Sequence, residues 1–246
     1  MFKFLDKGSN KMAPAKKLAS ELDFASAEAY NLLRTNVSFA LAGKDGGAKL
    51  FGVSSPCPQE GKSFTSINLS YALAKDGHKV LLIDADMRRP SVSTVLELSR
   101  TPGLSNVLAG ANPDETIHYG TLHENLDVLL SGDIPPNPSE LLGSPMMQRL
   151  IGEFGEKYDY IVVDLPPVTA VADPLIMSKM LDGIIVVVRH AYTRKRNIRE
   201  AVRQLHFSGV RILGFVYNGY HHGSGRYYKK SKYYRKDYAY KENKEA

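Results

Sequence analysis

The chain has 246 residues, an ordinary apolar fraction of 43%, one cysteine and a formal net charge of +6. This length suits one large α/β domain with appendages, and the single Cys57 excludes an internal disulfide and favours the cytosol. Eight Lys and Arg against three Asp and Glu in 226–246 contribute +5 of the charge, so the basic pI indicates a basic tail on a nearly neutral body, and we expect no nucleic-acid partner.

The first predicted segment, residues 1–24, is a loose basic arm. It is charged throughout and lacks the apolar region of a signal peptide. The longest aliphatic run, 184–188, is far shorter than a membrane span. We therefore expect a cytoplasmic protein that lies at the inner face of the cell membrane through a partner, or through the attraction of its basic tail to anionic lipid.

The middle of the chain alternates helical patterns with short aliphatic runs. Apolar residues at helical spacing predict helices at 26–41, 63–75, 145–157 and 193–207. The aliphatic runs predict strands at 50–55, 79–86, 126–132, 160–167, 183–190 and 210–218. Continuous apolar strands separated by helices imply a mainly parallel sheet flanked by helices on both faces. We predict one α/β domain over 25–220.

SSPCPQEGKS (54–63) follows the first predicted strand and opens a helix, as a phosphate-binding loop requires. Backbone N–H groups and the helix N-terminus would cradle phosphate oxygens. Pro56 replaces the usual first glycine, but Gly-Lys-Ser is intact, and the alternative is a chance Gly-Lys-Ser. We predict a P-loop NTPase fold with ATP and Mg²⁺ as cofactors. The nucleotide would be bound by Ser55, Pro58, Gln59, Glu60, Gly61, Lys62, Ser63 and Phe64.

LLIDADMRRP (81–90) places two carboxylates at the end of a predicted strand, where ligands of open α/β sheets bind. Asp84 and Asp86 are two residues apart, so both would point at the same phosphate and metal. Together with Lys62 they are the predicted catalytic residues, and either aspartate could accept the proton from an attacking hydroxyl. Arg88 would neutralise phosphate charge, with a surface salt bridge as the alternative.

YIVVDLPP (160–167) has the form of a Walker B strand, an apolar run followed by Asp164. Taken alone this signal is weak, and it gains weight from the two motifs that precede it. The predicted magnesium site consists of Ser63, Asp84 and Asp164.

The C-terminal segment combines tyrosines and cations with almost no aliphatic residues, so we expect residues 221–246 to be a disordered tail. A flexible arm of this length reaches roughly 25 Å, enough to enter a neighbouring subunit's site. The predicted phosphorylation sites are Tyr227, Tyr228, Tyr233, Tyr234, Tyr238 and Tyr240. Taken alone, the tail could equally be a basic anchor with interfacial tyrosines.

These motifs together resemble the deviant-Walker ATPases related to MinD and ParA, and within them the bacterial tyrosine kinases (BY-kinases) of capsule and exopolysaccharide synthesis. The resembling motifs are a Walker A at 54–63, a Walker A′ at 81–88, a Walker B at 160–164 and a tyrosine cluster at 227–240. Pro56 and Cys57 occupy the region of the MinD and ParA signature lysine, which favours the kinase branch. An adenine-reading asparagine of the relatives matches Asn218, for which a turn-forming role is the alternative.

The resemblance implies an ATP-dependent protein-tyrosine kinase that autophosphorylates its tail in trans and regulates capsule or exopolysaccharide biosynthesis. It also implies a transmembrane activator of the polysaccharide co-polymerase type, a cognate tyrosine phosphatase and a homo-oligomer. The family's oligomer helix carries E-x-x-R-x-x-R, but here Asn31 stands between Glu28 and Arg34 in place of the first arginine, which weakens the expectation of a ring. The alternatives are a MinD/ParA-like ATPase switch without kinase activity and a scaffold that binds nucleotide only to assemble.

Overall fold

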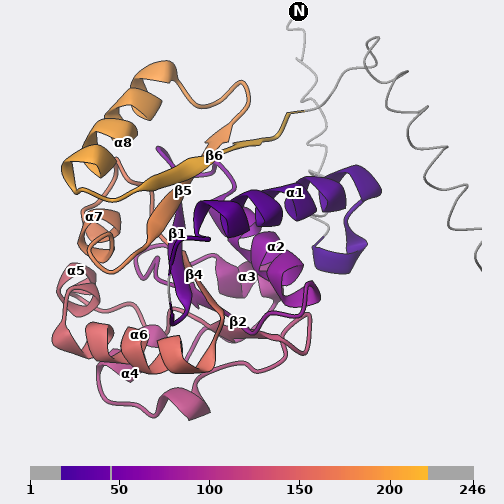
Figure 1. Cartoon of the computed structure of the whole chain (residues 1–246). Helices are drawn as coiled ribbons and strands as arrows, with labels where there is room; N and C mark the ends of the chain where they lie inside the picture. The colour runs from indigo at the N-terminus through magenta and orange to yellow at the C-terminus, as the bar shows by residue number, and fades with distance from the viewer. Residues whose placement is uncertain (1–17, 45, 221–246) are drawn as a thin grey trace, which may run out of the picture.

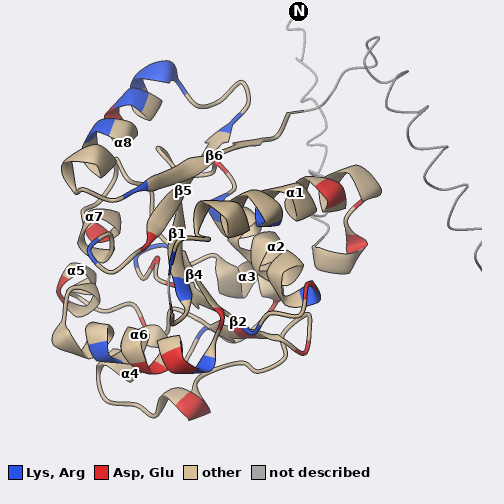
Figure 2. Ribbon diagram, in the orientation of Figure 1, with Lys and Arg blue, Asp and Glu red and all other residues tan. Residues whose placement is uncertain are grey.

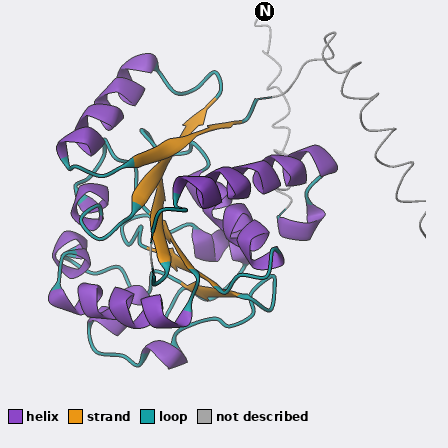
Figure 3. Cartoon of the chain, in the orientation of Figure 1, coloured by secondary structure: helices purple, strands orange, loops and turns teal. Residues whose placement is uncertain are grey.

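The computed structural model describes residues 18–44 and 46–220. Within them a six-stranded sheet runs through the centre of the domain, in the order β3-β2-β4-β1-β5-β6 (Figures 1 and 3). Its strands pair only in parallel: β1 Lys49–Ser54, β2 Val80–Asp84, β3 Leu126–Leu129, β4 Tyr160–Asp164, β5 Gly183–Arg189 and β6 Ile212–Asn218. The prediction of a mainly parallel α/β sheet is confirmed. The tail and its six tyrosines lie outside the described residues.

Helices connect the strands as the alternating pattern predicts. The four long ones lie within two residues of their predicted bounds: α1 Phe24–Ala40, α2 Lys62–Lys75, α6 Pro145–Lys157 and α8 Lys195–Phe207. The sequence pattern missed the short elements: α3 Val92–Leu96, α4 Leu104–Leu108, α5 Pro138–Leu142, α7 Asp173–Met177 and the 3₁₀ turns η1 Ala19–Glu21 and η2 Pro113–Glu115. Elements of five residues or fewer contain too few turns for a helical period to stand out.

Successive strand residues point to opposite sides of the sheet, and from β1 to β5 nearly all of them are buried, whereas Phe215 and Tyr217 of the edge strand β6 are exposed. On one face Phe51 and Val53 pack with α1, α2 and α3, and on the other Leu50 packs with the layer of α4 to α8 (Figure 1). The outermost helix of that layer, α8, buries Ala201 and Leu205 and turns a basic face to solvent (Figure 2). Among the described residues, no helix combines the length and apolarity needed to cross a bilayer.

Three strands end two or more residues earlier than the sequence predicts. β2 stops at Asp84, not residue 86, because the Asp84 carboxylate accepts the backbone N–H of Asp86 (3.1 Å) and turns the chain out of the sheet. β4 stops at Asp164, since Pro166 and Pro167 follow and have no N–H to donate. β3 likewise stops at residue 129 instead of 132. Asp84 and Asp164 therefore lie at the carboxyl ends of their strands, and Asp86 lies on the loop that follows β2.

The residues just before the predicted domain start at 25 pack on the domain. Ala19 is buried, and its N–H donates to the Asn68 carboxamide of α2 (2.9 Å). The Asp23 carboxylate caps α1 by accepting the N–H of Ser26 (2.9 Å). The folded unit thus includes η1 as well as α1.

Two glycines give a matched test of how the start of α4 packs against the chain that follows β3. A β-carbon on Gly103 would lie 2.3 Å from the backbone oxygen of Leu130, whereas one on Gly152, within α6, meets nothing within 4 Å. We expect Gly103→Ala to destabilise the protein by about 2 kcal/mol or more, because backbone atoms cannot move aside cheaply. Gly152→Ala should stabilise it by about 0.5–1 kcal/mol through helix propensity. Urea unfolding followed by circular dichroism measures both, and equal effects would contradict the packing.

Candidate functional site

The predicted phosphate loop lies between the end of β1 and the start of α2. Gly61 is the N-cap of α2 and adopts a left-handed conformation (φ 94°). A β-carbon there would lie 2.0 Å from the Asn218 amide nitrogen, so only glycine fits. Gln59 also has a positive φ, of 63°, although it has a side chain. The loop thus holds two backbone conformations of the kind that aim consecutive N–H groups into a concave anion site.

Parallel register brings the three predicted aspartates together. Asp84 of β2 lies opposite Asp164 of β4, and Asp164 lies opposite Val53 of β1, just before the loop. All three carboxylates, at 84, 86 and 164, are buried. The carboxyl ends of β1, β2 and β4 therefore form one acidic floor beside the phosphate loop, at the edge where ligands of open α/β sheets bind.

Lys62 is the cation among these carboxylates. Its Nζ lies 2.9 Å from Asp86 Oδ2 and 3.3 Å from Asp164 Oδ2. Burial alone would lower the pKa of Lys62, but the attraction of Asp164 and then Asp86 outweighs burial and raises the pKa above its ordinary value. The side chain is thus a fixed positive charge. A bound phosphate could replace the carboxylates as the partner of its ammonium group.

The Ser63 hydroxyl lies between two oxygens. It donates to Asp164 Oδ2 (2.5 Å) and accepts from the Ser91 hydroxyl (2.7 Å). Ser66, one turn along α2, donates to Asp164 Oδ1 (3.0 Å). The structure thus joins the predicted metal residues Ser63 and Asp164 directly. Ser66 shares the helix face of Ser63 and could have been found from sequence, whereas Ser91 gave no signal.

Asp84 is fully buried and holds its own loop. Its oxygens accept the N–H groups of Asp86 (3.1 Å) and Val92 (3.3 Å). Burial, then repulsion from Asp164, raises the pKa of Asp84 to about 8, although Lys62 opposes the shift. Burial likewise raises the pKa of Asp164. Ionising all three carboxyls beside one ammonium would leave an excess of buried negative charge, and the raised pKa values of Asp84 and Asp164 reflect that cost.

These donors fit a magnesium ion with bound phosphates. Mg²⁺ prefers oxygen ligands, commonly one or two carboxylates completed by water and phosphate, and the Ser63 hydroxyl and Asp164 carboxylate are of that kind. The excess negative charge favours a divalent cation. Among the described residues no group of three or more His, Cys, Asp and Glu side chains forms a protein-only metal cage, so these residues would hold the ion only in part.

Arg88 points at another partner. Its guanidinium donates to both oxygens of the buried Asp173 (Nε 2.9 Å, Nη2 3.2 Å) and to the Ser139 hydroxyl (2.9 Å). This contact ties the loop that carries Asp86 to α5 and α7. It matches the salt-bridge alternative named for Arg88, and the predicted phosphate contact stays a prediction. Neither Asp173 nor Ser139 was found from the sequence.

Asn218, at the end of β6, lies over the phosphate loop. Its amide nitrogen donates to the Glu60 carbonyl oxygen (2.9 Å). The predicted contact with adenine is not tested by this geometry. Ser55, Pro58 and Phe64, also predicted to bind nucleotide, lie in or beside the same loop.

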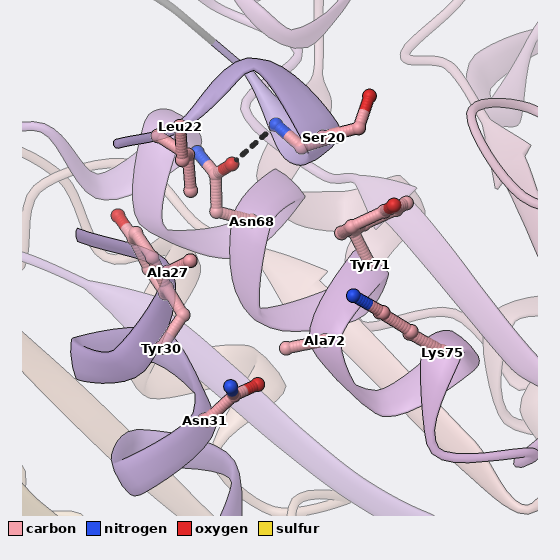
Figure 4. Close-up of a pocket in the computed structure, with 10 residues that line it drawn as sticks. Ser20, Leu22, Ala27, Tyr30, Asn31, Asn68, Tyr71, Ala72 and Lys75 are labelled. Atoms are coloured by element: carbon pink, nitrogen blue, oxygen red, sulfur yellow. Dashed lines mark hydrogen bonds between the residues drawn. The ribbon is translucent and has the colours of Figure 1, made fainter. Parts of the chain in front are cut away.

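The predicted oligomer helix has internal partners. Arg34 pairs with Asp76 (2.6 Å), and the Asn31 amide donates to Glu28 (2.8 Å). Next to them, a pocket of about 160 Å³ between η1, α1 and α2 is lined by residues that include Tyr30 and Tyr71 (Figure 4). Burial raises the pKa of Tyr30 to about 12. No residue of the phosphate loop lines this pocket, so it is separate from the candidate site.

The chain is similar to known proteins in sequence and in fold. A family model described as ParA, NUBPL iron-transfer P-loop NTPase, matches residues 51–246. A tyrosine-protein kinase of Bacillus subtilis, YwqD, is 41% identical over 192 residues, 78% of this chain and 80% of its own length. The kinase domain of the Escherichia coli tyrosine kinase ETK superposes with a TM-score of 0.76 at 29% identity, covering 88% of this chain and 86% of that one.

Some relatives are much longer than this chain. The putative tyrosine-protein kinase EpsB of Ralstonia solanacearum is 38% identical over 205 residues, which are 83% of this chain and 27% of that protein. The chain therefore spans about a quarter of that relative's length.

The raised pKa of Asp84 predicts a pH dependence of stability. A carboxyl whose folded pKa lies above its unfolded pKa stabilises the fold fully below the unfolded value, and this contribution is lost as pH rises through the folded value. Without nucleotide, we expect the wild type to lose on the order of a few kcal/mol relative to Asp84→Asn between about pH 4 and pH 8. Denaturant unfolding of both proteins across this range measures the difference, and parallel curves would contradict it.

Proposed function

The chain belongs to the bacterial tyrosine-protein kinases, and on that premise we propose that it transfers the γ-phosphoryl group of ATP to tyrosines of its own C-terminal tail. It is a protein-tyrosine kinase by family; the acceptor, the route in trans and the partners are the proposal. The observation that carries it is the cluster of Lys62, Asp86 and Asp164 beside the phosphate loop, at the carboxyl ends of neighbouring strands.

Binding of ATP would use the loop and its lysine. The backbone N–H groups of residues 59–63, at the start of α2, would hold phosphate oxygens. Lys62 supplies a positive charge, because the attraction of Asp164 and Asp86 outweighs its burial and keeps it protonated. Ser63 and Asp164 would hold Mg²⁺, which neutralises phosphate charge when bound. Asn218 already lies on the loop, and we propose that it contacts the adenine.

Asp86 is the better candidate for the general base. Asp84 is fully buried and uses its oxygens on the N–H groups of Asp86 and Val92, so it shapes the loop. The Asp86 side chain is 5% exposed, and its Oδ2 lies 2.9 Å from Lys62 while its Oδ1 accepts the Arg89 N–H (3.0 Å). We propose that an incoming phenol reaches Asp86 from this exposed side. A carboxylate in that position would orient the tyrosine hydroxyl and accept its proton.

Transfer requires a phenol in line with the γ-phosphate, a position that buried core tyrosines cannot reach. We propose that tyrosines of 227–240 take that position in a neighbouring subunit. Each phosphate adds about −1.5 to −2 charge, so six phosphates would add roughly −9 to −12. The segment 226–246 carries +5, and phosphorylation would reverse its sign. We propose that this reversal switches its contacts with neighbours and with anionic lipid.

The family resemblance also supplies the proposed setting. We propose a cytoplasmic kinase held at the inner face of the membrane by a transmembrane activator of the polysaccharide co-polymerase type, and reset by a tyrosine phosphatase. Its output would be control of capsule or exopolysaccharide biosynthesis. The described helices could not themselves span a bilayer, which is why an anchoring partner is part of the proposal.

A MinD/ParA-like ATPase switch without kinase activity is the second candidate. The match of the ParA family model to residues 51–246 favours it. The two candidates separate on one measurement, because a switch releases phosphate from ATP without forming phosphotyrosine.

Substitutions in the cluster test the proposed chemistry. With MgATP and activator, Lys62→Met should lower phosphotyrosine formation by about 100-fold or more, because the charge that stabilises phosphate is lost. Asp86→Asn should lower the turnover number by about 100-fold or more while MgATP still binds, as expected of a base. Mass spectrometry measures phosphotyrosine, and calorimetry measures binding. ATP hydrolysis by the wild type with residues 227–240 unmodified would overturn the kinase proposal and support the switch.

Two defective chains test transfer between subunits. Lys62→Met keeps every acceptor tyrosine, and a variant with Phe at all six tail tyrosines keeps the catalytic cluster. Mixed with MgATP and activator, the pair should gain phosphate on the tail of the Lys62→Met chain, which mass spectrometry distinguishes from the Phe tail. Transfer restricted to the same chain predicts that the mixture stays unmodified, with the wild type as the positive control.

A further inference from the structure

The phosphate loop is fastened from a second part of the chain, the end of β5 with its connection to α8 and the end of β6. Arg189 donates to the Gln59 carbonyl oxygen (3.0 Å), and Asn218 donates to the Glu60 carbonyl oxygen (2.9 Å). These two contacts hold the peptide groups on either side of Glu60, directly after the left-handed Gln59. A conformation of this kind persists only where its surroundings over-determine it.

The Glu60 side chain completes this fastening. The residue is fully buried, and its Oε2 accepts the backbone N–H of Cys57 within the loop (2.8 Å). Its Oε1 accepts a hydrogen bond from the Thr193 hydroxyl (2.5 Å). The same hydroxyl accepts a hydrogen bond from the backbone N–H of Arg189 (2.7 Å). A continuous chain of hydrogen bonds thus runs from the end of β5, through Thr193 and Glu60, to the base of the loop, and such chains reinforce one another.

A buried acid in an anion-binding loop is electrostatically unfavourable in itself. Its negative charge repels phosphate, and burial raises the pKa of the Glu60 carboxyl against the effect of its hydrogen bonds. Removing the acid should therefore strengthen nucleotide binding, unless the carboxylate is needed to shape the loop. Both of its oxygens are engaged in doing so.

We infer that Glu60 and Thr193 are positioning residues, a latch that holds the phosphate loop in its nucleotide-binding shape. The inference rests on the proposed function in that the loop's ligand is a nucleoside phosphate. The two residues lie 133 positions apart, so the latch joins the first βα unit of the fold to the last. Their side chains would act through the loop backbone, without themselves touching the nucleotide.

The first test is the affinity of the full-length protein for MgADP, measured by calorimetry. Thr193→Val removes the hydroxyl and keeps the branched shape, and it should raise the Kd about tenfold, the effect of losing a hydrogen bond to a charged group. Thr193→Ser should restore the Kd to within about twofold. Thr121→Val removes a similar half-buried hydroxyl, bonded to the His118 carbonyl oxygen, and should leave the Kd unchanged.

The second test uses the sign of the effect at Glu60. Glu60→Gln removes the negative charge, and its amide retains only one acceptor oxygen for the two donors. A latch predicts that MgADP binds several-fold more weakly, whereas an acid that merely lies near the phosphates predicts tighter binding. Glu60→Gln combined with Thr193→Val should weaken binding less than the product of the two single effects, because both break one chain of bonds.

Thermal unfolding of each variant without nucleotide separates positioning from folding. A Kd for Thr193→Val within twofold of wild type, tighter binding by Glu60→Gln, or equal weakening by Thr121→Val would overturn the latch. If Thr193→Val does not fold, Glu60→Gln decides alone. Binding of MgADP involves no phosphoryl transfer, so a chain that binds it normally and forms no phosphotyrosine would contradict the proposed function and leave the latch intact.

Discussion

Three buried carboxylates share one ammonium group at the carboxyl edge of the sheet, and the rest of the site depends on this imbalance. Asp84, Asp86 and Asp164 meet there because β2 and β4 are neighbours in register and β1 lies beside β4. The cluster is buried, so solvent screens it little and the charges act at close range. Hydroxyl and backbone N–H groups donate to Asp84 and Asp164. These hydrogen bonds weaken the repulsion between the carboxylates without cancelling it. A cation with oxygen preference fits such a floor, and a phosphate fits only together with that cation and Lys62.

The loop above this floor is held from several directions, and each contact fixes a different peptide group. Thr169, after β4, donates to the Pro56 carbonyl oxygen (2.7 Å). Contacts from the ends of β5 and β6 hold Gln59 and Glu60. Pro56 stands where such loops usually have their first glycine, and Gln59 takes a left-handed conformation although it is not glycine. Both features make outside support of the loop more important. A loop supported in this way is pre-organised, so ordering it costs little binding energy.

Helix α1 limits the kinds of contact that could form between subunits in the proposed homo-oligomer. The two charged residues that remain of the family's oligomer motif, Glu28 and Arg34, both have partners within the chain. Leu32 and Phe39 of the same helix are 63% and 76% exposed, and apolar surface of that kind is costly in water. Contacts between subunits through α1 would therefore draw on apolar burial more than on ion pairs, which are worth little where solvent reaches them.

The sequence by itself determined the parallel α/β fold, the phosphate loop and the three strand-end acids. Each of these is written in consecutive residues, as an aliphatic run or a short motif, and local physics reads such patterns directly. Only the tertiary structure decided which side chains meet. The pairs of Glu60 with Thr193, Arg88 with Asp173 and Ser63 with Ser91 join distant segments. It also decided that Asp86 leaves the strand, because one hydrogen bond from its N–H to Asp84 outweighs the strand's apolar pattern. Which side chains pair depends on how distant segments pack together, and no local pattern of residues contains that information.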